Sequence, residues 1–235
     1  KKSLNHPMKN NSFRYHRLFI LFVVSLTFIS LKGIAAVAPP SLRCVSVGIN
    51  GSVTLTWAPP ADPNGEFLSY VVYSSISKIV PYTQTPVLGL GTNSFNDPVN
   101  ANGSSFYYFV QTVYDDGSGP TASNSSDTAQ SMLPVFTAAS DSTCTIQWDP
   151  VFSPNTVTSL GVYTIFRKIG SGPYVFAGTT NYGTETFNDV FKVCSDSVYY
   201  RIEIEDQIGC VSTSAILKNL FEDNDAPDSP VIDSI

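Results

Sequence analysis

The sequence has 235 residues, of which 43% are hydrophobic, 12% aromatic and 14% charged, and its formal net charge is −6. Six of the 13 lysines and arginines, but none of the 19 acidic residues, lie in residues 1–36, so the remainder carries seven positive and 19 negative residues, a net charge of −12. This acidity disfavours binding to nucleic acid or anionic membrane surfaces, and the positive residues form no cluster along the sequence.

Residues 1–36 are typical of an export signal. Met8 is the expected start, and a basic segment then precedes an apolar run over residues 18–31. This run is shorter than the ~20 apolar residues of a spanning helix and fits the ~7–15 of a signal-peptide core. We expect cleavage after Ala36, with an uncleaved N-terminal anchor as the alternative. The protein is therefore predicted to be secreted or displayed at the cell surface, without membrane insertion after cleavage.

The chain after the signal has the alternation of β-strands. Val53, Leu55 and Trp57 fall on one face of a predicted strand, with polar residues between them. Such period-2 patterns in β-branched and aromatic residues indicate half-buried strands. Further strands with turn residues between them are predicted at Tyr70 to Ser74, Tyr107 to Tyr114, Cys144 to Trp148, Val162 to Arg167 and Tyr199 to Glu205. No amphipathic helix is predicted after the signal.

Several landmarks recur 92 residues apart. They are Phe95-Asn96-Asp97 with Phe187-Asn188-Asp189, Tyr107-Tyr108 with Tyr199-Tyr200, and Gly117 with Gly209. Trp57 and Trp148 recur at 91. A fixed period of this length indicates tandem copies of one domain.

The repeats divide the chain into four parts. Residues 1–36 are the signal, 38–130 the first domain, 131–222 the second, and 223–235 a linker with the start of a truncated third repeat. The last assignment rests on Ala226-Pro227-Asp228-Ser229-Pro230, which resembles the opening of the first repeat at Ala38-Pro39-Pro40-Ser41.

Both repeats resemble the fibronectin type III domain. The shared marks are a tryptophan that closes the second strand, a tyrosine-rich third strand, and a later strand that opens with tyrosine. These residues are Trp57, Tyr70 and Tyr108 in the first repeat and Trp148, Tyr163 and Tyr200 in the second. The resemblance implies an all-β protein of two tandem immunoglobulin-like β-sandwiches with these aromatic residues in the core. It also implies a tyrosine corner, in which the hydroxyls of Tyr108 and Tyr200 return to the backbone.

The resemblance also bears on the four cysteines. In a fibronectin-type sandwich, Cys144 and Cys194 lie at the same end of the second domain, so we expect them to form a disulfide. The alternative pairing is Cys194 with Cys210. Cys44 has no counterpart in the second repeat and is a candidate free thiol.

The sequence offers little for catalysis. Both histidines lie in residues 1–36, which removes histidine-based catalysis and imidazole-bound zinc from the rest of the chain. Glu203 and Glu205 share one strand face and are expected to be solvated. No glycine-rich phosphate loop or basic-aromatic patch is evident in the sequence. We therefore predict no enzyme activity, no catalytic residue and no organic cofactor.

One acidic cluster is a candidate calcium site. Glu222, Asp223 and Asp225 lie after the second repeat, in a run that is similar to the calcium-binding linker of cadherins. Calcium takes six to eight oxygen ligands, largely from carboxylates and carbonyls. A polar linker that binds no metal is the alternative.

The predicted function is that of a non-catalytic structural or adhesive module, a stalk or spacer, that contacts protein or glycan at the cell surface. The repeats are similar in style to those of large surface proteins of gliding bacteria. The first alternative is a spacer in an exported hydrolase whose catalytic domain lies beyond residue 235. A ligand-binding ectodomain that uses the loops at one end of a sandwich ranks third.

Overall fold

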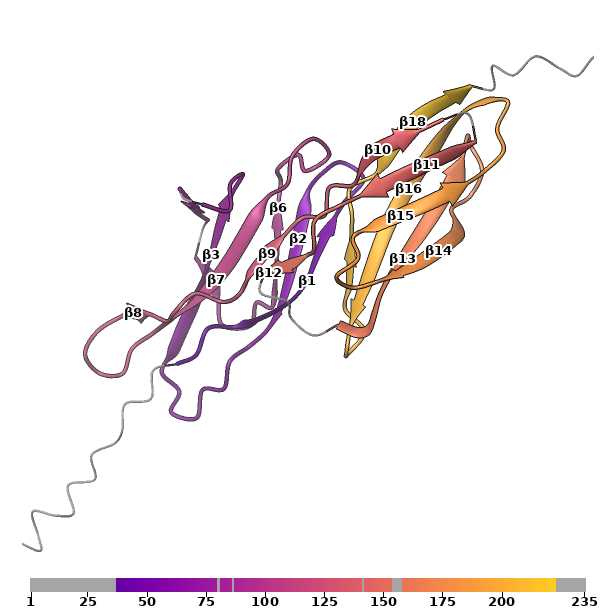
Figure 1. The fold of residues 1–235 in the computed structure, drawn as a ribbon. Coiled ribbons are helices and arrows are strands. Elements are labelled where there is room, and N and C mark those ends of the chain that lie inside the picture. The colour runs from indigo at the N-terminus through magenta and orange to yellow at the C-terminus, as the bar shows by residue number, and fades with distance from the viewer. Residues whose placement is uncertain (1–36, 80, 86, 141, 154–157, 223–235) are drawn as a thin grey trace, which may run out of the picture. The chain divides into compact units, whose positions relative to one another are not determined.

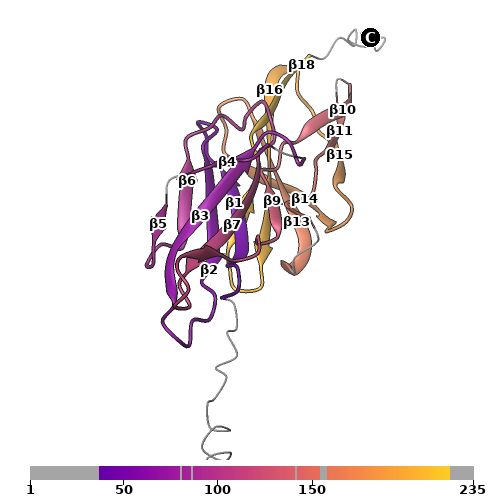
Figure 2. The same ribbon diagram turned by 90° about the vertical axis from the view of Figure 1, so that its left-hand side faces the viewer.

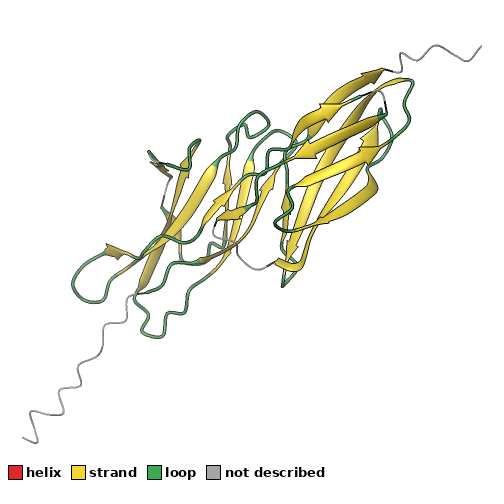
Figure 3. Cartoon of the chain, viewed as in Figure 1, coloured by secondary structure: helices red, strands yellow, loops and turns green. Residues whose placement is uncertain are grey.

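The computed structural model describes residues 37–79, 81–85, 87–140, 142–153 and 158–222. In this part of the chain all regular structure is β-strand, and no helix occurs (Figure 3). The predicted all-β class is confirmed. Among the same residues there is accordingly no helix long and apolar enough to cross a membrane.

The first repeat forms two antiparallel sheets (Figure 1). One has the strand order β1-β2-β6, and the other has the order β12-β9-β7-β3-β4, with β5 beside β3 and β8 beside β7. The strands are β1 (Ser41–Val47), β2 (Val53–Ala58), β3 (Phe67–Ser75), β4 (Thr83–Gln84), β5 (Leu88–Gly89), β6 (Ser94–Asp97), β7 (Tyr107–Tyr114), β8 (Thr121–Ala122) and β9 (Thr128–Gln130).

The second repeat follows the same plan (Figure 2). Its smaller sheet has the order β10-β11-β15, and its larger sheet has the order β14-β13-β16-β17 with β18 also paired to β16. The strands are β10 (Val135–Ala139), β11 (Thr143–Gln147), β12 (Phe152–Ser153), β13 (Thr158–Ile169), β14 (Val175–Asn181), β15 (Thr186–Val190), β16 (Ser195–Asp206), β17 (Val211–Thr213) and β18 (Leu217–Glu222). Strand β12 departs from this plan because it pairs with β9 of the first repeat.

Each pair of sheets encloses an aromatic core. Trp57 at β2 packs edge-on against Tyr70 of the facing strand β3, with ring centroids 5.3 Å apart. Trp148, just after β11, packs in the same way against Tyr163 of β13 at 5.2 Å. These contacts join the two sheets of each repeat across a buried interior, as a β-sandwich requires. The predicted pair of tandem sandwiches is therefore confirmed.

A bulge interrupts the first strand of each repeat. Leu42 lies opposite Trp57 and Cys44 lies opposite Thr56, so Arg43 is an extra residue on β1. Thr137 is the extra residue at the corresponding place on β10. A bulge changes the direction of the side chains around it. In the first repeat, residues at and beside the bulge are among those that contact the second repeat.

Candidate functional site

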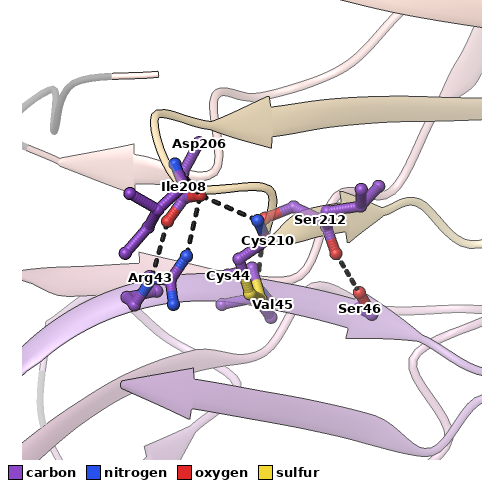
Figure 4. The surroundings of a disulfide bond; sticks show 9 residues. Arg43, Cys44, Val45, Ser46, Asp206, Ile208, Cys210 and Ser212 are labelled. Carbon is purple, nitrogen blue, oxygen red and sulfur yellow. Dashed lines mark hydrogen bonds and ion pairs between the residues drawn. A yellow bond between two sulfur atoms is a disulfide. The ribbon is translucent and has the colours of Figure 1, made fainter. Parts of the chain in front are cut away.

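The main candidate site is a junction between the two repeats, which is closed by a disulfide. Cys44 on β1 is bonded to Cys210, which directly precedes β17, with Cα atoms 5.9 Å apart (Figure 4). The bond joins residues that are separated by 166 positions in the sequence. Neither predicted pairing forms, and Cys144 and Cys194 are free cysteines.

An ion pair lies beside the disulfide. The Arg43 guanidinium donates two hydrogen bonds to the Asp206 carboxylate, from Nε to Oδ2 at 2.8 Å and from Nη2 to Oδ1 at 2.9 Å (Figure 4). Asp206 Oδ1 also accepts the backbone N–H groups of Ile208 and Cys210. One carboxylate thus fixes the turn that carries Cys210 and the arginine next to Cys44. This bidentate geometry, with two parallel charge-assisted hydrogen bonds, is the strongest type of arginine–carboxylate contact.

The electrostatics of Asp206 follow from these contacts. Burial opposes ionisation of the carboxyl. The hydrogen bond from Arg43, those from the backbone of Cys210 and Ile208, and the nearby positive charge together outweigh that effect. They hold the pKa of Asp206 below its usual value, and the same pair raises the pKa of Arg43. The ionised pair is therefore the stable form at neutral pH.

Polar contacts continue along both sides of the junction. The N–H of Val45 donates to Ser212 Oγ at 3.1 Å, and Ser46 Oγ donates to the carbonyl of Val211 at 2.8 Å. On the other side, β12 pairs with β9. A backbone hydrogen bond from Gln130 N to Val151 O at 2.7 Å lies beside that pairing.

The core explains why Cys144 does not bond to Cys194. Cys144 is buried, and its thiol donates to the hydroxyl of Tyr200 at 3.2 Å. Burial raises the pKa of this thiol and so disfavours the thiolate, which is the form that reacts. Cys194 is instead exposed, in the segment before β16. Cys194 also does not pair with Cys210, which is bonded to Cys44 across the junction.

The recurrent tyrosines bond to a carboxylate, not to the backbone as a tyrosine corner would. Tyr108 donates its hydroxyl to Asp97 Oδ2 at 3.2 Å, and Tyr200 donates to Asp189 Oδ2 at 2.7 Å. Both aspartates are buried, as are the tyrosines. Burial raises the pKa of Asp97, because the charged form loses its hydration. In the second repeat, Arg167 adds an ion pair to Asp189 at 2.8 Å.

The other predicted site residues lie apart from the junction. Of the calcium candidates, Glu222 ends β18, whereas Asp223 and Asp225 lie outside the described residues. Within the described part of the chain, no group of three or more histidine, cysteine or acidic residues is placed to hold a metal ion. Glu203 forms an ion pair with Arg201 at 3.0 Å on the outer face of β16.

The positive residues form no cluster along the sequence, but three of them meet in space. Lys168 and Lys218 both lie over the ring of Tyr199, and Arg201 lies over the rings of Phe166 and Tyr174. These residues are dispersed in the sequence and meet because they come from neighbouring strands of one sheet.

Sequence reasoning missed the junction, although the repeats contain a signal for it. Cys44 has no counterpart in the second repeat, and the position 92 residues before Cys210 is Ser118. Each cysteine is thus specific to one repeat. The signal is incomplete, because Cys144 and Cys194 are equally specific to one repeat and yet are free.

Comparisons with known proteins find matches among solved structures at low sequence identity. No protein-family model and no curated protein sequence matches the chain. Among solved structures, the chain is similar to the FN1–FN3 domains of chicken CNTN1, with 13% identity and a TM-score of 0.34 over 79% of this chain and 69% of that one. It is also similar to a two-domain fibronectin type III segment of chicken tenascin, with 15% identity and a TM-score of 0.30 over 79% and 99%.

Proposed function

We propose that this protein is a non-catalytic structural module of an exported or cell-surface protein, in which the two sandwiches act as a tension-resistant spacer with adhesive contacts to protein or glycan. The location outside the cytosol is supported by the disulfide, since such bonds persist in oxidising compartments and are rare where thiols are kept reduced. The sequences of the repeats, which resemble the repeat regions of large surface proteins of gliding bacteria, support membership of a protein of that kind.

The observation that carries the proposal is the position of the disulfide. Cys44 lies in the first strand of the first sandwich, and Cys210 lies ahead of the last two strands of the second. A force that pulls residue 37 away from residue 222 therefore passes from β1 through the disulfide to β17 and β18. The 165 residues between the cysteines are shielded from this force. Such a path suits a module that must transmit tension without unfolding.

Single-molecule stretching tests this load path. Handles are attached at residues 37 and 222, and the oxidised protein is compared with the double variant Cys44→Ser, Cys210→Ser. At ~3.3–3.6 Å per extended residue, the 166-residue separation corresponds to roughly 550–600 Å of chain, which the disulfide prevents from extending. We expect the variant to release this length in unfolding steps and the oxidised protein to withhold it.

Cys194→Ser is the matched control, because Cys194 is an exposed free cysteine outside the junction. This variant should stretch as the oxidised protein does. If the oxidised protein releases the full length at the same forces as the double variant, the disulfide carries no load and the proposal fails.

A further inference from the structure

The outer face of the larger sheet in the second sandwich carries a stack of cations and aromatic rings. We call it the basic-aromatic face, and its members are Phe166, Lys168, Tyr174, Tyr199, Arg201 and Lys218. Lys168 Nζ lies 5.0 Å from the ring centroid of Tyr199 and 5.9 Å from that of Tyr174. Lys218 Nζ lies 5.2 Å from the centroid of Tyr199. Arg201 Cζ lies 4.9 Å from the centroid of Tyr174 and 5.3 Å from that of Phe166.

Strand register explains how these residues meet. Tyr199 of β16 pairs with Lys168 of β13 on one side and with Lys218 of β18 on the other. Arg201 pairs with Phe166 in the next row. Because neighbouring strands lie ~4.8 Å apart, the two lysines flank the tyrosine in a line across the sheet, about 10 Å from each other.

The charge of this face contrasts with that of the chain. Three of the seven positive residues beyond residue 36 lie on it, in a part of the chain with a net charge of −12. Arg201 forms an ion pair with Glu203, whereas neither lysine of the face has a carboxylate within ion-pair distance among the described residues. The aromatic rings position the two lysine ammonium groups, and the charges of these groups remain available to an anionic partner.

Apolar side chains extend the face at both sides. Phe176 of β14 pairs with Phe166 and is 64% exposed, and Leu220 of β18 lies two residues from Lys218 and is 55% exposed. Exposed apolar side chains beside fixed cations suit a partner with both apolar and anionic groups. The face is part of a continuous sheet, so it suits an extended polymer better than a small molecule held in a pocket.

We propose that the basic-aromatic face binds an acidic polysaccharide, a glycan that carries carboxylate or sulfate groups. Its anionic groups would pair with Lys168 and Lys218, while the C–H faces of its sugar rings would pack against Phe176 and Leu220. Nucleic acid, also a polyanion, has along its phosphate backbone no face as apolar as the C–H face of a sugar ring, so it fits the exposed Phe176 and Leu220 less well. This inference rests on the proposed adhesive role and names the class of its partner.

A binding assay with defined polymers tests the proposal. The oxidised protein is titrated with heparin as the sulfated probe, polygalacturonate as the carboxylated probe, and dextran as the neutral one. We expect at least one anionic glycan to bind and dextran not to bind. The double variant Lys168→Gln, Lys218→Gln should weaken binding about tenfold or more, and the slope of log affinity against log salt should fall by about two.

The matched control is Lys78→Gln with Lys192→Gln, which removes two exposed lysines away from the face. It should keep the affinity of the unmodified protein, and circular dichroism should show the same fold in both double variants. Loss of affinity in the control equal to that in the test variant would overturn the assignment, as would the absence of anionic-glycan binding.

Poly-L-glutamate is a further arm of the assay. If it binds more tightly than both anionic glycans, the face serves an acidic protein and the glycan proposal is wrong. If no polymer binds while the stretching experiment still shows a shielded chain, only the partner is wrong and the spacer role stands.

Discussion

At the scale of single residues, the Asp97–Tyr108 and Asp189–Tyr200 hydrogen bonds explain the recurrent motifs. In each repeat, the aspartate and the tyrosine lie on neighbouring elements of the core and are both buried. A buried hydroxyl needs an acceptor and a buried carboxylate needs donors, since either group alone would lose its water without replacement. Phe-Asn-Asp and Tyr-Tyr therefore recur together, 92 residues apart, because they supply the two halves of one contact.

Replacement of Tyr108 by Phe should destabilise the protein. The change removes the hydroxyl and leaves the buried Asp97 carboxylate without this donor, at a cost of about 1–3 kcal/mol. Urea unfolding of the purified variant measures the loss. Tyr107→Phe is the control, since Tyr107 is only partly buried and its side chain points to the opposite face of β7. Equal stability of the two variants would mean that the Asp97 contact contributes nothing.

At the scale of elements, two tight turns between strands place glycine at a positive φ, a conformation that other residues adopt only with strain. Gly51, in the turn between β1 and β2, has φ +83°, and its carbonyl accepts the N–H of Ala101. A Cβ at this position would overlap Asn100 Oδ1 and lie 3.1 Å from the backbone nitrogen of Ala101. Gly65, in the turn between β2 and β3, has φ +71° but no neighbouring atom within 4 Å of such a Cβ.

This difference gives a matched pair of variants. Gly65→Ala should cost about 1–2 kcal/mol, which is the strain of an L-residue at positive φ. Gly51→Ala bears the same strain and also forces Asn100 or the backbone of Ala101 to move, so it should cost at least about 1 kcal/mol more. Thermal and urea unfolding of both variants checks the order. A smaller loss for Gly51→Ala would show that this turn has room to adjust.

The bulge in β1 shows how one element serves two purposes. Leu42 and Val45 remain in the core of the first sandwich, while Arg43, Cys44 and Ser46 contact the second. The extra residue at the bulge makes both sets of contacts possible, because strict alternation would place Cys44 and Leu42 on the same face. Strand β10 has the same bulge but lacks the arginine and cysteine.

At the scale of the whole molecule, the junction couples the stability of both sandwiches to pH. The pKa of Asp206 is lowered in the folded protein. Its contribution to stability is therefore present above the unfolded pKa of about 3.9 and is lost as the pH falls through the folded value.

Asp206→Asn should test this coupling. The variant should be less stable than the unmodified protein at pH 7, and the difference should shrink toward zero as the pH falls below about 4. Urea unfolding between pH 7 and pH 2 measures it. Asp127→Asn removes an equal charge at an exposed position and should show little difference at any pH. A loss in Asp206→Asn that does not vary with pH would contradict the ion-pair assignment.

The sequence by itself determined the fold class, the strands and the aromatic cores. Period-2 alternation is a local property, so it places Trp57 in the interior without knowledge of anything distant in the chain, whereas the core position of Tyr70 is what the resemblance to fibronectin type III domains implies. It also predicted β7 with its observed bounds, Tyr107–Tyr114.

Only the tertiary structure decided the disulfide, the acceptors of the tyrosine hydroxyls and the basic-aromatic face. Cys44 and Cys210 are 166 residues apart, and their pairing depends on how β1 contacts β17, which no local pattern encodes. Lys168, Arg201 and Lys218 are dispersed in the sequence and meet because three strands align in one register. The physical reason is the same in each case: a strand's own face is set by its alternation, whereas its neighbours are set by the packing of the whole chain.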